Sequence, residues 1–571
     1  MNFLPTSAKE IKALGWTELD VILFTGDCYV DHSAFGTAVI ARVLEDIGLR
    51  VAVVPQPNWR DDLRDFRKLG RPRLFFGVSA GNMDSMVNHY TAAKRLRSDD
   101  AYTAGGKAGF RPDYAATVYT KILKDIYPDV PVVLGGIEAS LRRLAHYDYW
   151  QDKLLPSILI GSGADILSYG MGEQTMVSIA KAMHNGFNPK LLRKIPQVAF
   201  VADKKYVDNL DKENTHFLHS FEQCLKNKRL FADNFKVIET ESNKIHQKTI
   251  VEKFEDKYVV VNPSLEPPTQ AQMDYAYSLP YTRLPHPRYN GKGAISAYEM
   301  IKHSVNIHRG CFGGCGFCTI SAHQGKFISS RSSESIIAEV KKIIEMPDFK
   351  GYLSDLGGPS ANMYQMSGID KDICEKCRRP SCLFPAKCKN LNNSHLPLLD
   401  LYNKVDSIKG VKKAFIGSGI RYDLFDDNAQ KYLREVIVRH TSGRLKVAPE
   451  HTEPHVLALM RKPSFALFEK LHKDFYKICE QERLRYQLIP YFISSHPACT
   501  ESDMASLHRR CARLNLHLEQ VQDFTPTPMT FSSAIFYSGV DPYTGNKVDV
   551  TRDMEKKKHQ KNYFFKKNKK Y

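Results

Sequence analysis

The amino-acid sequence predicts an α/β protein in which an N-terminal doubly wound, Rossmann-like domain is followed by a partial (β/α)6 barrel. Short apolar runs that end in glycine alternate with stretches of helical periodicity, first over residues 1–200 and again over residues 291–530. Such alternation is typical of parallel sheets covered by helices. The length of 571 residues also exceeds what one core can hold, and at about 150 residues per domain it favours two to four domains.

Hydrophobic periodicity places the elements of the N-terminal domain in order. Residues 20–26 form a short apolar run typical of a buried parallel strand, and the spacing of apolar residues over 39–47 predicts the helix that follows it. Further strands are predicted at 50–54, 74–78, 130–134 and either 158–160 or 166–168, with helices at 114–125 and 175–183.

Glycine-rich loops follow the strands of this predicted sheet, at residues 25–27, 79–82, 135–138 and 170–173. Ligands of doubly wound sheets bind beyond the carboxyl ends of the strands. A single glycine there only ends a strand tightly, but four such loops together indicate that the backbone approaches a ligand closely.

Residues 201–290 lose this alternation and predict a connector or a small inserted subdomain. The stretch is charged, and a strand pair is expected at 235–241 and 258–261. Pro263, Pro267 and Pro268 end it before the chain enters the central domain.

The central domain repeats the strand and helix alternation. Strands are predicted into Ile307 and at 352–354, 413–416, 445–447, 486–489 and 517–521, with helices at 333–346, 430–440, 453–460, 465–480 and 501–514. Six strands fit a partial (β/α)6 barrel, whose chemistry gathers at the carboxyl ends of the strands.

Three cysteines, Cys311, Cys315 and Cys318, lie within eight residues at the spacing Cys-x3-Cys-x2-Cys. Three thiolates can hold a 4Fe-4S cluster and leave one iron open to another ligand, and the glycines between them allow the tight loop that this requires. The alternative is a zinc site completed by His308 or His323. Structural zinc loops usually use Cys-x2-Cys pairs, which favours the cluster.

A second group of cysteines, Cys374, Cys377, Cys382 and Cys388, lies in a Cys-rich insertion at residues 370–395. Four thiolates make a closed site that suits structural zinc and an auxiliary 4Fe-4S cluster equally well. Because the insertion follows the second barrel strand, we expect it to lie over the mouth of the barrel.

The first cysteine loop, with Phe317 before its last cysteine, resembles the radical S-adenosylmethionine (SAM) motif. The flanking stretches 283–287, 308–311, 323–326 and 330–332 are similar to the YgiQ-type family of radical SAM proteins, and this similarity covers nearly the whole chain. It implies that the cluster donates one electron to SAM, which breaks into methionine and a 5′-deoxyadenosyl radical that abstracts hydrogen from an unidentified substrate. It also implies an electron donor such as flavodoxin or ferredoxin.

The resemblance extends to the residues that would bind SAM. Phe317 belongs to the cofactor-binding motif, and Gly357 and Gly358 correspond to the Gly-Gly-Glu element that meets the methionyl amino group. Pro359 stands where that element has glutamate, so the amino contact is left to the backbone.

Three polar residues that follow predicted barrel strands complete the candidate site. Ser418 and Arg421 are predicted to meet the ribose and the carboxylate of SAM, because a hydroxyl bonds a sugar and the rigid guanidinium suits a carboxylate. Glu450 is predicted to accept a hydrogen bond from the ribose or to position the substrate. Arg421 and Glu450 are the candidate catalytic residues.

Placed before such a barrel, the N-terminal domain resembles the cobalamin-binding-like domain of many radical SAM enzymes. The chain lacks the motif Asp-x-His-x-x-Gly and has only Asp31-His32 with Gly36 four residues on. We therefore do not expect cobalamin that is ligated by histidine, and we expect the domain to be vestigial or to organise substrate rather than to bind cobalamin.

Composition bounds the remaining functions. The chain has no run of about 18 apolar residues and no apolar signal segment, so a cytoplasmic protein that does not enter a membrane is expected. Its 81 Lys and Arg exceed its 63 Asp and Glu by 18, and RNA is a substrate compatible with that charge. The segment 531–571 is predicted to be a basic C-terminal tail, and its residues 552–571 are predicted to be solvated. An alternative function is a basic zinc-binding protein that interacts with nucleic acid.

Overall fold

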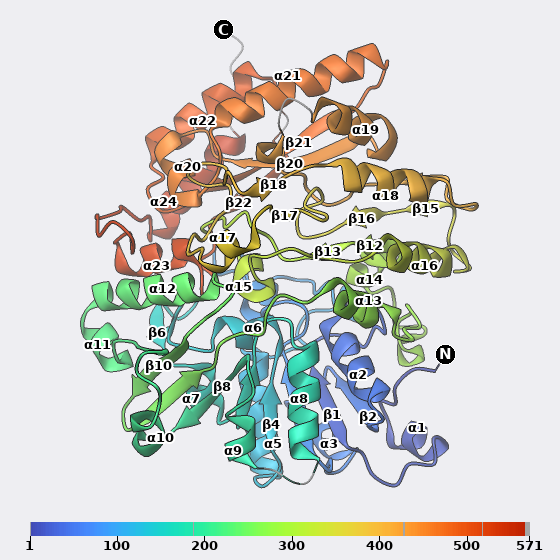
Figure 1. Ribbon diagram of the computed structural model, residues 1–571, viewed down its shortest axis with the longest axis vertical. Helices are drawn as coiled ribbons and strands as arrows, with labels where there is room; N and C mark the ends of the chain where they lie inside the picture. The colour runs from blue at the N-terminus through green and yellow to red at the C-terminus, as the bar shows by residue number, and fades with distance from the viewer. Residues whose placement is uncertain (1, 185, 187, 426–428, 517, 566–571) are drawn as a thin grey trace.

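The computed structural model describes residues 2–184, 186, 188–425, 429–516 and 518–565. Figure 1 shows two α/β parts stacked along the long axis of the molecule, with the N-terminal part (blue to green) below and the barrel (yellow to red) above. A large, mainly parallel sheet forms the lower part, and shorter parallel strands form the upper part. The predicted fold class is confirmed.

Within the described residues, the N-terminal part is built on one nine-stranded sheet. Five parallel strands are followed by four that continue the sheet mainly through antiparallel pairs. In spatial order the strands are β2 (Val51–Pro55), β1 (Val21–Thr25), β3 (Phe75–Ser79), β4 (Val132–Leu134), β7 (Ile166–Ser168), β8 (Val198–Ala202), β11 (Lys257–Val261), β10 (Thr249–Phe254) and β9 (Thr215–Phe217). The accompanying helices are α1 (Ala8–Ala13), α2 (Gly36–Asp46), α3 (Arg64–Arg67), α4 (Ser85–His89), η1 (Ala104–Gly106), α5 (Ala115–Ile126), α6 (Gly136–Leu141), α7 (Ile158–Ser162), α8 (Glu173–Met183), α9 (Pro189–Leu192), α10 (Lys204–Asp208), α11 (Phe221–Lys226), α12 (Lys228–Ser242) and α13 (Gln270–Ser278), with a separate hairpin of β5 (His146–Asp148) and β6 (Lys153–Leu155).

The parallel strands are buried on both faces, which explains why their sequences read as continuous apolar runs. Along β1, Val21 and Leu23 belong to the core shared with α2 and α8, whereas Ile22 and Phe24 belong to the core shared with α5 and α7. Helices therefore cover both faces, as expected of a doubly wound sheet.

Two predicted elements of this part are corrected. Of the two alternatives for the fifth strand, residues Ile166–Ser168 form β7 and residues Ile158–Ser162 form α7. The strand predicted at 235–241 is wrong, because these residues lie in α12. Phe231, Phe235 and Ile238 are all buried and recur at helical spacing, so they form one apolar face of a helix.

The stretch 201–290, predicted as a connector or inserted subdomain, adds β9, β10 and β11 to the same sheet. Strand β8 also runs across the predicted boundary at residue 200. The division into domains at this point stays a prediction, but the sheet is continuous across it.

A buried acid on β10 gives this region a testable pH dependence. Glu252 accepts a hydrogen bond from Ala145 N (2.7 Å), and burial raises the pKa of its carboxyl to about 7 from the ordinary 4.5. The folded state thus favours the neutral carboxylic acid. Its contribution to stability is fully present below pH 4.5, the ordinary pKa, and is lost as the pH rises through about 7, the pKa in the folded state. The free energy of unfolding of Glu252→Gln should therefore exceed that of the wild type at pH 8 by an amount on the order of 3 kcal/mol, and the variant should melt at a higher temperature. Near pH 4 the two proteins should differ little.

Thermal melts of both proteins at the two pH values measure this effect. Glu255→Gln, in the exposed turn of the same hairpin, is the matched control and should melt like the wild type at both values. An equal difference between Glu252→Gln and wild type at the two pH values would contradict the assignment.

The described part of the barrel has six parallel strands, of which the second is interrupted. They are β12 (Ser304–Asn306), β15 with β16 (Tyr352–Leu353, Asp355–Gly357), β19 (Lys413–Ala414), β20 (Arg444–Glu450), β21 (Gln487–Ser494) and β22 (Gln520–Asp523). Neighbouring strands pair in parallel. An isolated parallel bridge between Ile420 and Val447 joins the loop after β19 to β20, so that the strands form one open barrel as predicted.

Five of the barrel helices agree closely with the sequence patterns, whereas the helix at Leu396–Asp406 was not predicted. The barrel helices are α16 (Ser333–Ile344), α18 (Leu396–Asp406), α19 (Gln430–His440), α20 (Pro454–Met460), α21 (Phe465–Gln481) and α22 (Glu501–Arg513). Shorter elements are η2 (Pro287–Tyr289), α14 (Ser296–Ile301), β13 (His308–Arg309), α15 (Ile320–Gln324), β14 (Ser329–Ser330), β17 (Ser367–Gly368), α17 (Lys371–Glu375), β18 (Leu391–Asn392) and η3 (Tyr422–Leu424). The last strand was predicted from His517, which lies outside the described residues.

The C-terminal segment is packed, which corrects the prediction of a solvated tail. Helix α23 (Phe531–Ser538) is almost wholly buried, and α24 (Met554–Asn562) and η4 (Tyr563–Phe565) follow it. Lys557 is only 2 % exposed and donates from Nζ to Tyr149 Oη (3.0 Å) and to Phe524 O (3.1 Å). The count of basic residues was misleading, because the ammonium group of this lysine is buried against the rings of Tyr149 and Phe536. Residues 566–571 lie outside the described residues.

Buried ion pairs join the two parts along the seam between them. Arg309 of β13 pairs with Glu173 of α8, and Arg283, which precedes the barrel, pairs with Glu339 of α16. Arg461, after α20, contacts Glu239 of α12 at 2.7 Å.

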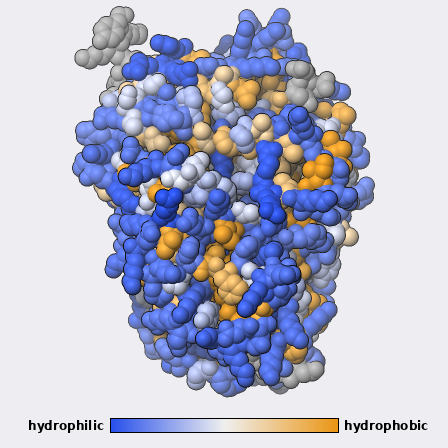
Figure 2. Space-filling view, turned by 60° about the vertical axis from the view of Figure 1, so that its left-hand side comes forward, coloured by the Kyte–Doolittle hydropathy of each residue, from blue (hydrophilic) through white to orange (hydrophobic). Residues whose placement is uncertain are grey.

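The surface is mostly polar. Figure 2 shows a face on which hydrophilic side chains predominate and hydrophobic ones gather in small groups near its middle. In the part of the chain that the structure describes, no helix combines the length and the apolar character needed to cross a bilayer.

Candidate active site and metal centre

The first cysteine loop joins β13 to α15 at the seam between the two parts. Its turns are fixed by hydrogen bonds from Cys318 N to Cys315 O (3.1 Å) and from Cys311 N to Gly325 O (3.2 Å). Gly310 has φ +85°, and a Cβ there would lie 2.1 Å from Phe327 O, so glycine alone fits. The sequence therefore folds this loop tightly with three free, partly buried thiols.

The three thiols lie close enough to influence one another electrostatically. Burial raises the pKa of Cys311, and it raises the pKa of Cys318 to about 12 with a further contribution from Cys315. Among the described residues, no three Cys, His, Asp or Glu side chains already surround a single metal-ion position. A 4Fe-4S cluster binds each thiolate through a different iron atom, and three thiols beside a guanidinium fit it chemically.

That guanidinium belongs to Arg421, which follows β19 as predicted. Its Nη1 lies 3.4 Å from Cys315 Sγ, and its Nη2 lies 2.5 Å from Asp423 Oδ2. A side chain at Gly313 would strike Arg421 Nη1, at 2.0 Å from a Cβ, so the loop and the guanidinium pack directly together. Arg421 is thus placed to offset the charge of thiolates.

Glu450 ends β20, and its backbone is unusual. The pairing of β20 with β21 is irregular between Val447 and Glu450, and Glu450 has φ +67°, a left-handed conformation that costs free energy for a non-glycine residue. Its side chain is 8 % exposed, and burial raises the pKa of its carboxyl although Lys462 and Arg421 oppose the shift. Strain and a perturbed acid together mark a candidate functional residue.

Ser418 and Gly357 gather around a residue that the sequence reasoning missed. Ser418 Oγ donates to Asp355, and Asp355 Oδ1 also accepts from Gly417 N (2.9 Å). A Cβ at Gly357 would meet Asp355 at 2.8 Å and Ser418 at 3.0 Å. The sequence could have indicated Asp355 as a site residue, because it begins the stretch Asp-Leu-Gly-Gly-Pro at a predicted strand end.

Gly358 packs against His308, which precedes the first cysteine loop, and does not face an open space. A Cβ at Gly358 would lie 2.5 Å from His308 Nε2, so the imidazole packs against the glycine. His308 Nε2 contacts Ser360 O at 2.9 Å, and burial lowers the pKa of His308 to about 4. His308 is therefore a neutral, buried ring whose Nε2 is engaged and whose Nδ1 has no hydrogen-bond partner, so the zinc alternative stays open at this residue.

Phe317 lies between the barrel and the C-terminal segment. Its ring is 6.3 Å from the ring of His496 in an edge-to-face arrangement, and His496 contacts Ser532 Oγ of α23 at 2.7 Å. The structure thus places Phe317 beside the end of β21, and its predicted role towards SAM stays a prediction.

The second group of cysteines surrounds a buried cation that the sequence reasoning also missed. Lys326 is 2 % exposed, and its Nζ lies 3.4 Å from Cys377 Sγ and donates to Arg379 O (2.8 Å). Burial raises the pKa of Cys374, and that of Cys382 to about 11, while the charge of Lys326 opposes both shifts. A lysine that contacts one of these thiols and acts electrostatically on two others suits a site whose bound metal leaves a negative charge.

The Cys-rich insertion also packs directly on the first cysteine loop. Cys382 N donates to Phe312 O (3.0 Å), and Ser381 Oγ donates to Gly313 O (2.7 Å). A Cβ at Gly314 would lie 2.3 Å from Pro380 O. The insertion therefore braces the loop that carries the first three thiols.

The predicted glycine-rich loops at 79–82, 135–138 and 170–173 line one cavity of about 450 Å³ at the carboxyl ends of β1, β3, β4 and β7, which we name the sheet-end cavity. Gly81, Gly135, Gly136, Gly170 and Gly172 all line it. Three of the four loops therefore converge, and the backbone can approach a ligand there, whereas residues 25–27 do not line the cavity and Gly26 packs against Ala80 O instead.

Comparisons with known proteins agree with these features. The family described as Radical SAM N-terminal matches residues 3–304, and a domain of unknown function, DUF3362, matches residues 519–569. A "UPF0313 protein" of Bacteroides thetaiotaomicron is 58% identical over 584 residues, covering 99% of this chain and 94% of its own. A "UPF0313 protein" of Methanocella arvoryzae is 44% identical over 551 residues, covering 96% and 90%.

The chain is also similar in fold to a solved structure, the radical SAM methyltransferase TsrM from Kitasatospora setae with cobalamin and a 4Fe-4S cluster bound. The TM-score is 0.51 at 14% identity, and the match covers 90% of this chain and 74% of that one. At this identity the likeness shows the fold alone.

Proposed function

Since the chain belongs to the UPF0313 family and carries the Radical SAM N-terminal domain, we propose that it is a radical SAM enzyme that uses a 4Fe-4S cluster and acts on an unidentified substrate. The observation that carries the proposal is the tight loop of Cys311, Cys315 and Cys318 with Arg421 packed against it. The three thiols would hold the cluster.

Such a cluster, when reduced by a donor such as flavodoxin or ferredoxin, supplies the electron that splits SAM into methionine and a 5′-deoxyadenosyl radical. The chain's own residues would bind and orient SAM. Arg421 offsets negative charge beside the thiols, and Ser418 with Asp355 presents hydrogen-bonding groups at the strand ends. Glu450 is a buried acid facing the same loop, suited to hold a ribose hydroxyl or the substrate.

The test is anaerobic reconstitution followed by metal analysis and reduction in the presence of SAM. We expect the absorption of a 4Fe-4S cluster and the formation of 5′-deoxyadenosine. Two zinc ions, no iron and salt-dependent RNA binding would support the alternative of a basic zinc-binding protein instead. That alternative assumes that the C-terminal segment is a mobile binding arm, whereas Lys557 of this segment is buried.

Replacing Arg421 with glutamine should slow SAM cleavage about tenfold to a hundredfold, because hydrogen bonds to charged groups are worth about 1.5–3 kcal/mol. The rate of 5′-deoxyadenosine formation measures this loss. The double variant Arg421→Gln/Asp423→Asn removes the unpaired buried carboxylate and should be equally slow. Arg439→Gln, which breaks only exposed ion pairs, is the matched control. Wild-type cleavage by Arg421→Gln would contradict a role for Arg421 in the site.

We further propose that Cys374, Cys377, Cys382 and Cys388 together hold one metal centre, either zinc or an auxiliary 4Fe-4S cluster. Both occupants suit four thiolates beside Lys326. Metal analysis of the wild type distinguishes the two occupants. If the second site holds zinc, the protein should contain zinc and the iron of one cluster; if it holds an auxiliary 4Fe-4S cluster, the protein should contain the iron of two clusters.

The TsrM structure contains cobalamin, so our expectation that cobalamin is absent needs its own test. Among the described histidines, His323 lines the sheet-end cavity, whereas His32 is buried outside it with Nδ1 accepting from Ala34 N (3.0 Å). We propose that no cobalamin is ligated by His32. Added hydroxocobalamin should give the same spectrum with wild type and with His32→Ala.

A further inference from the structure

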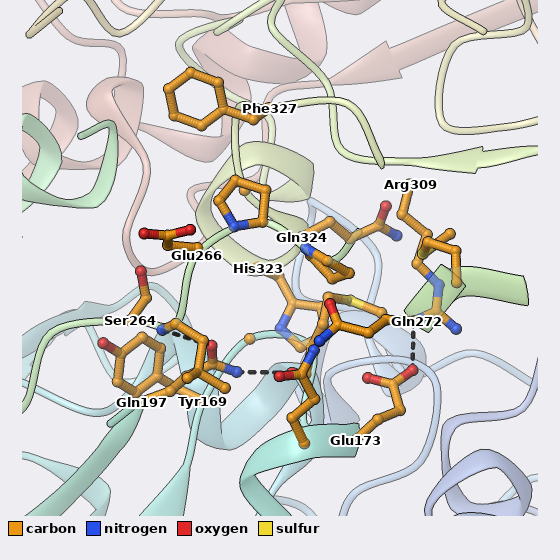
Figure 3. A pocket seen from close by; sticks show the side chains of 18 of the residues that line it. Tyr169, Glu173, Gln197, Ser264, Glu266, Gln272, Arg309, His323, Gln324 and Phe327 are labelled. Carbon is orange, nitrogen blue, oxygen red and sulfur yellow. Dashed lines mark hydrogen bonds and ion pairs between the residues drawn. The ribbon is translucent and has the colours of Figure 1, made fainter. Parts of the chain in front are cut away.

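A second cavity of about 450 Å³ lies at the seam between the N-terminal sheet and the first cysteine loop, and we name it the seam cavity. Figure 3 shows its polar side chains: His323 and Gln324 of α15 lie between Tyr169 and Gln197 on one side and Arg309 with Glu173 on the other. The walls thus come from both halves of the chain.

Arg143, in the loop after α6, lines this cavity as a buried cation without a counter-ion. It is 4 % exposed, and within the described residues no carboxylate forms an ion pair with it. Nη1 donates to Ser140 O (2.7 Å), Nη2 donates to Ser242 Oγ (3.3 Å), and the guanidinium lies 4.7 Å from the centre of the Tyr169 ring. Its Nε is buried and has no hydrogen-bond partner.

The neighbouring residue shows how unusual this is. Arg142 is buried to the same degree but pairs with Asp84. A buried charge is costly unless it is paired and hydrogen-bonded. The partners of Arg143 are a backbone carbonyl, a serine hydroxyl and a tyrosine ring, all of which are neutral. Within the described residues Arg143 therefore lacks the anionic partner that Arg142 has.

His323 adds a second unsatisfied group to the same wall. Its Nδ1 is buried without a hydrogen-bond partner. Burial and the nearby charges of Arg143 and Arg309 lower the pKa of His323 to about 4 although Glu173 opposes the shift, so the ring is neutral at neutral pH and can donate one hydrogen bond. Arg143 and His323 together offer several N–H groups to one ligand.

Apolar side chains that include Ile47, Val177 and Met273 form part of the cavity wall, and charged ones that include Glu266 and Lys244 line it as well. A small neighbouring void of about 30 Å³ is lined both by Arg143 and by Cys315 and Cys318. The head of a ligand at Arg143 would thus lie next to the first cysteine loop.

We propose that the seam cavity binds a small molecule with an apolar body and one oxyanionic head, a carboxylate or a phosphate, which Arg143 and His323 recognise. The site goes beyond the proposed function and does not depend on it, because the binding requires neither SAM nor a reduced cluster.

The test is calorimetric titration of the anaerobically reconstituted full chain with three probes of six carbons each: hexanoate, hexyl phosphate and neutral hexanamide. We expect at least one anion to bind the wild type ten times more tightly than hexanamide, and the tighter anion identifies the head group. Arg143→Gln should reduce that preference to less than twofold.

Arg193→Gln is the matched control, because Arg193 also lies over aromatic rings and bonds a backbone carbonyl, but lines neither cavity. It should keep the wild-type preference. If Arg143→Gln does not fold, Arg143→Lys replaces it and should retain a weakened preference for the anion. Equal binding of anions and hexanamide by the wild type, or an unchanged preference in Arg143→Gln, would overturn the proposal whatever the outcome of the SAM cleavage assay.

Discussion

Replacing Cys311, Cys315 or Cys318 with alanine should reduce SAM cleavage to background. A site with three protein ligands has no spare thiol, so each substitution removes a bond that the cluster cannot replace. The loop itself should survive, because its turns are held by backbone hydrogen bonds and by glycines rather than by the thiols.

Iron content, cluster absorption and 5′-deoxyadenosine formation measure this result in anaerobically reconstituted protein. Cys479→Ala is the matched control, since Cys479 is a buried thiol of α21 in the barrel core, outside both cysteine groups. It should keep full cluster content and activity. A variant of Cys311, Cys315 or Cys318 that kept both would show that the ligands are assigned wrongly.

Replacing Cys374 with serine should remove the second metal and slow SAM cleavage without abolishing it. A closed tetrathiolate site contributes folding free energy directly, on the order of 10 kcal/mol for structural zinc, so losing one ligand should disorder the insertion. Ser381 and Cys382 then no longer brace the backbone at Phe312 and Gly313. The first cluster keeps its own three ligands but loses its support.

Metal analysis together with the cleavage rate separates the two effects, and Cys388→Ser should behave in the same way. Ser381→Ala offers a milder comparison, because it breaks one contact with Gly313 and leaves all four thiols in place. It should retain the second metal and cleave SAM at an intermediate rate. Complete loss of the first cluster in folded Cys374→Ser protein would show that the two centres are not separable.

Local patterns predicted the regular elements well for a physical reason. Strands buried on both faces, such as β1, and amphipathic helices, such as α19, follow from hydrophobic spacing within a few residues. The same reasoning failed at α12, because Phe235 and Ile238 suit a strand as well as a helix. Only the contact of α12 with α23 and the barrel decides between them.

In the candidate site, too, some features could be predicted from local sequence and others could not. The positions of Arg421 and Glu450 at strand ends could be predicted from chain order, and the structure places both near the cysteine loop. Contacts between distant segments could not be predicted. Lys326 beside Cys377 and Asp355 beside Ser418 depend on how loops meet in the folded barrel, and nothing in their own sequence fixes that meeting.

The buried ion pairs along the seam bear on how molecules enter. A hinge motion that parted the two halves would strip Arg309 from Glu173, Arg283 from Glu339 and Arg461 from Glu239 in one movement. Separating a buried pair leaves charges in a poorly solvated place, which makes such an open state rare. We therefore expect the halves to move as one rigid body, with entry and exit governed by small rearrangements of surface loops.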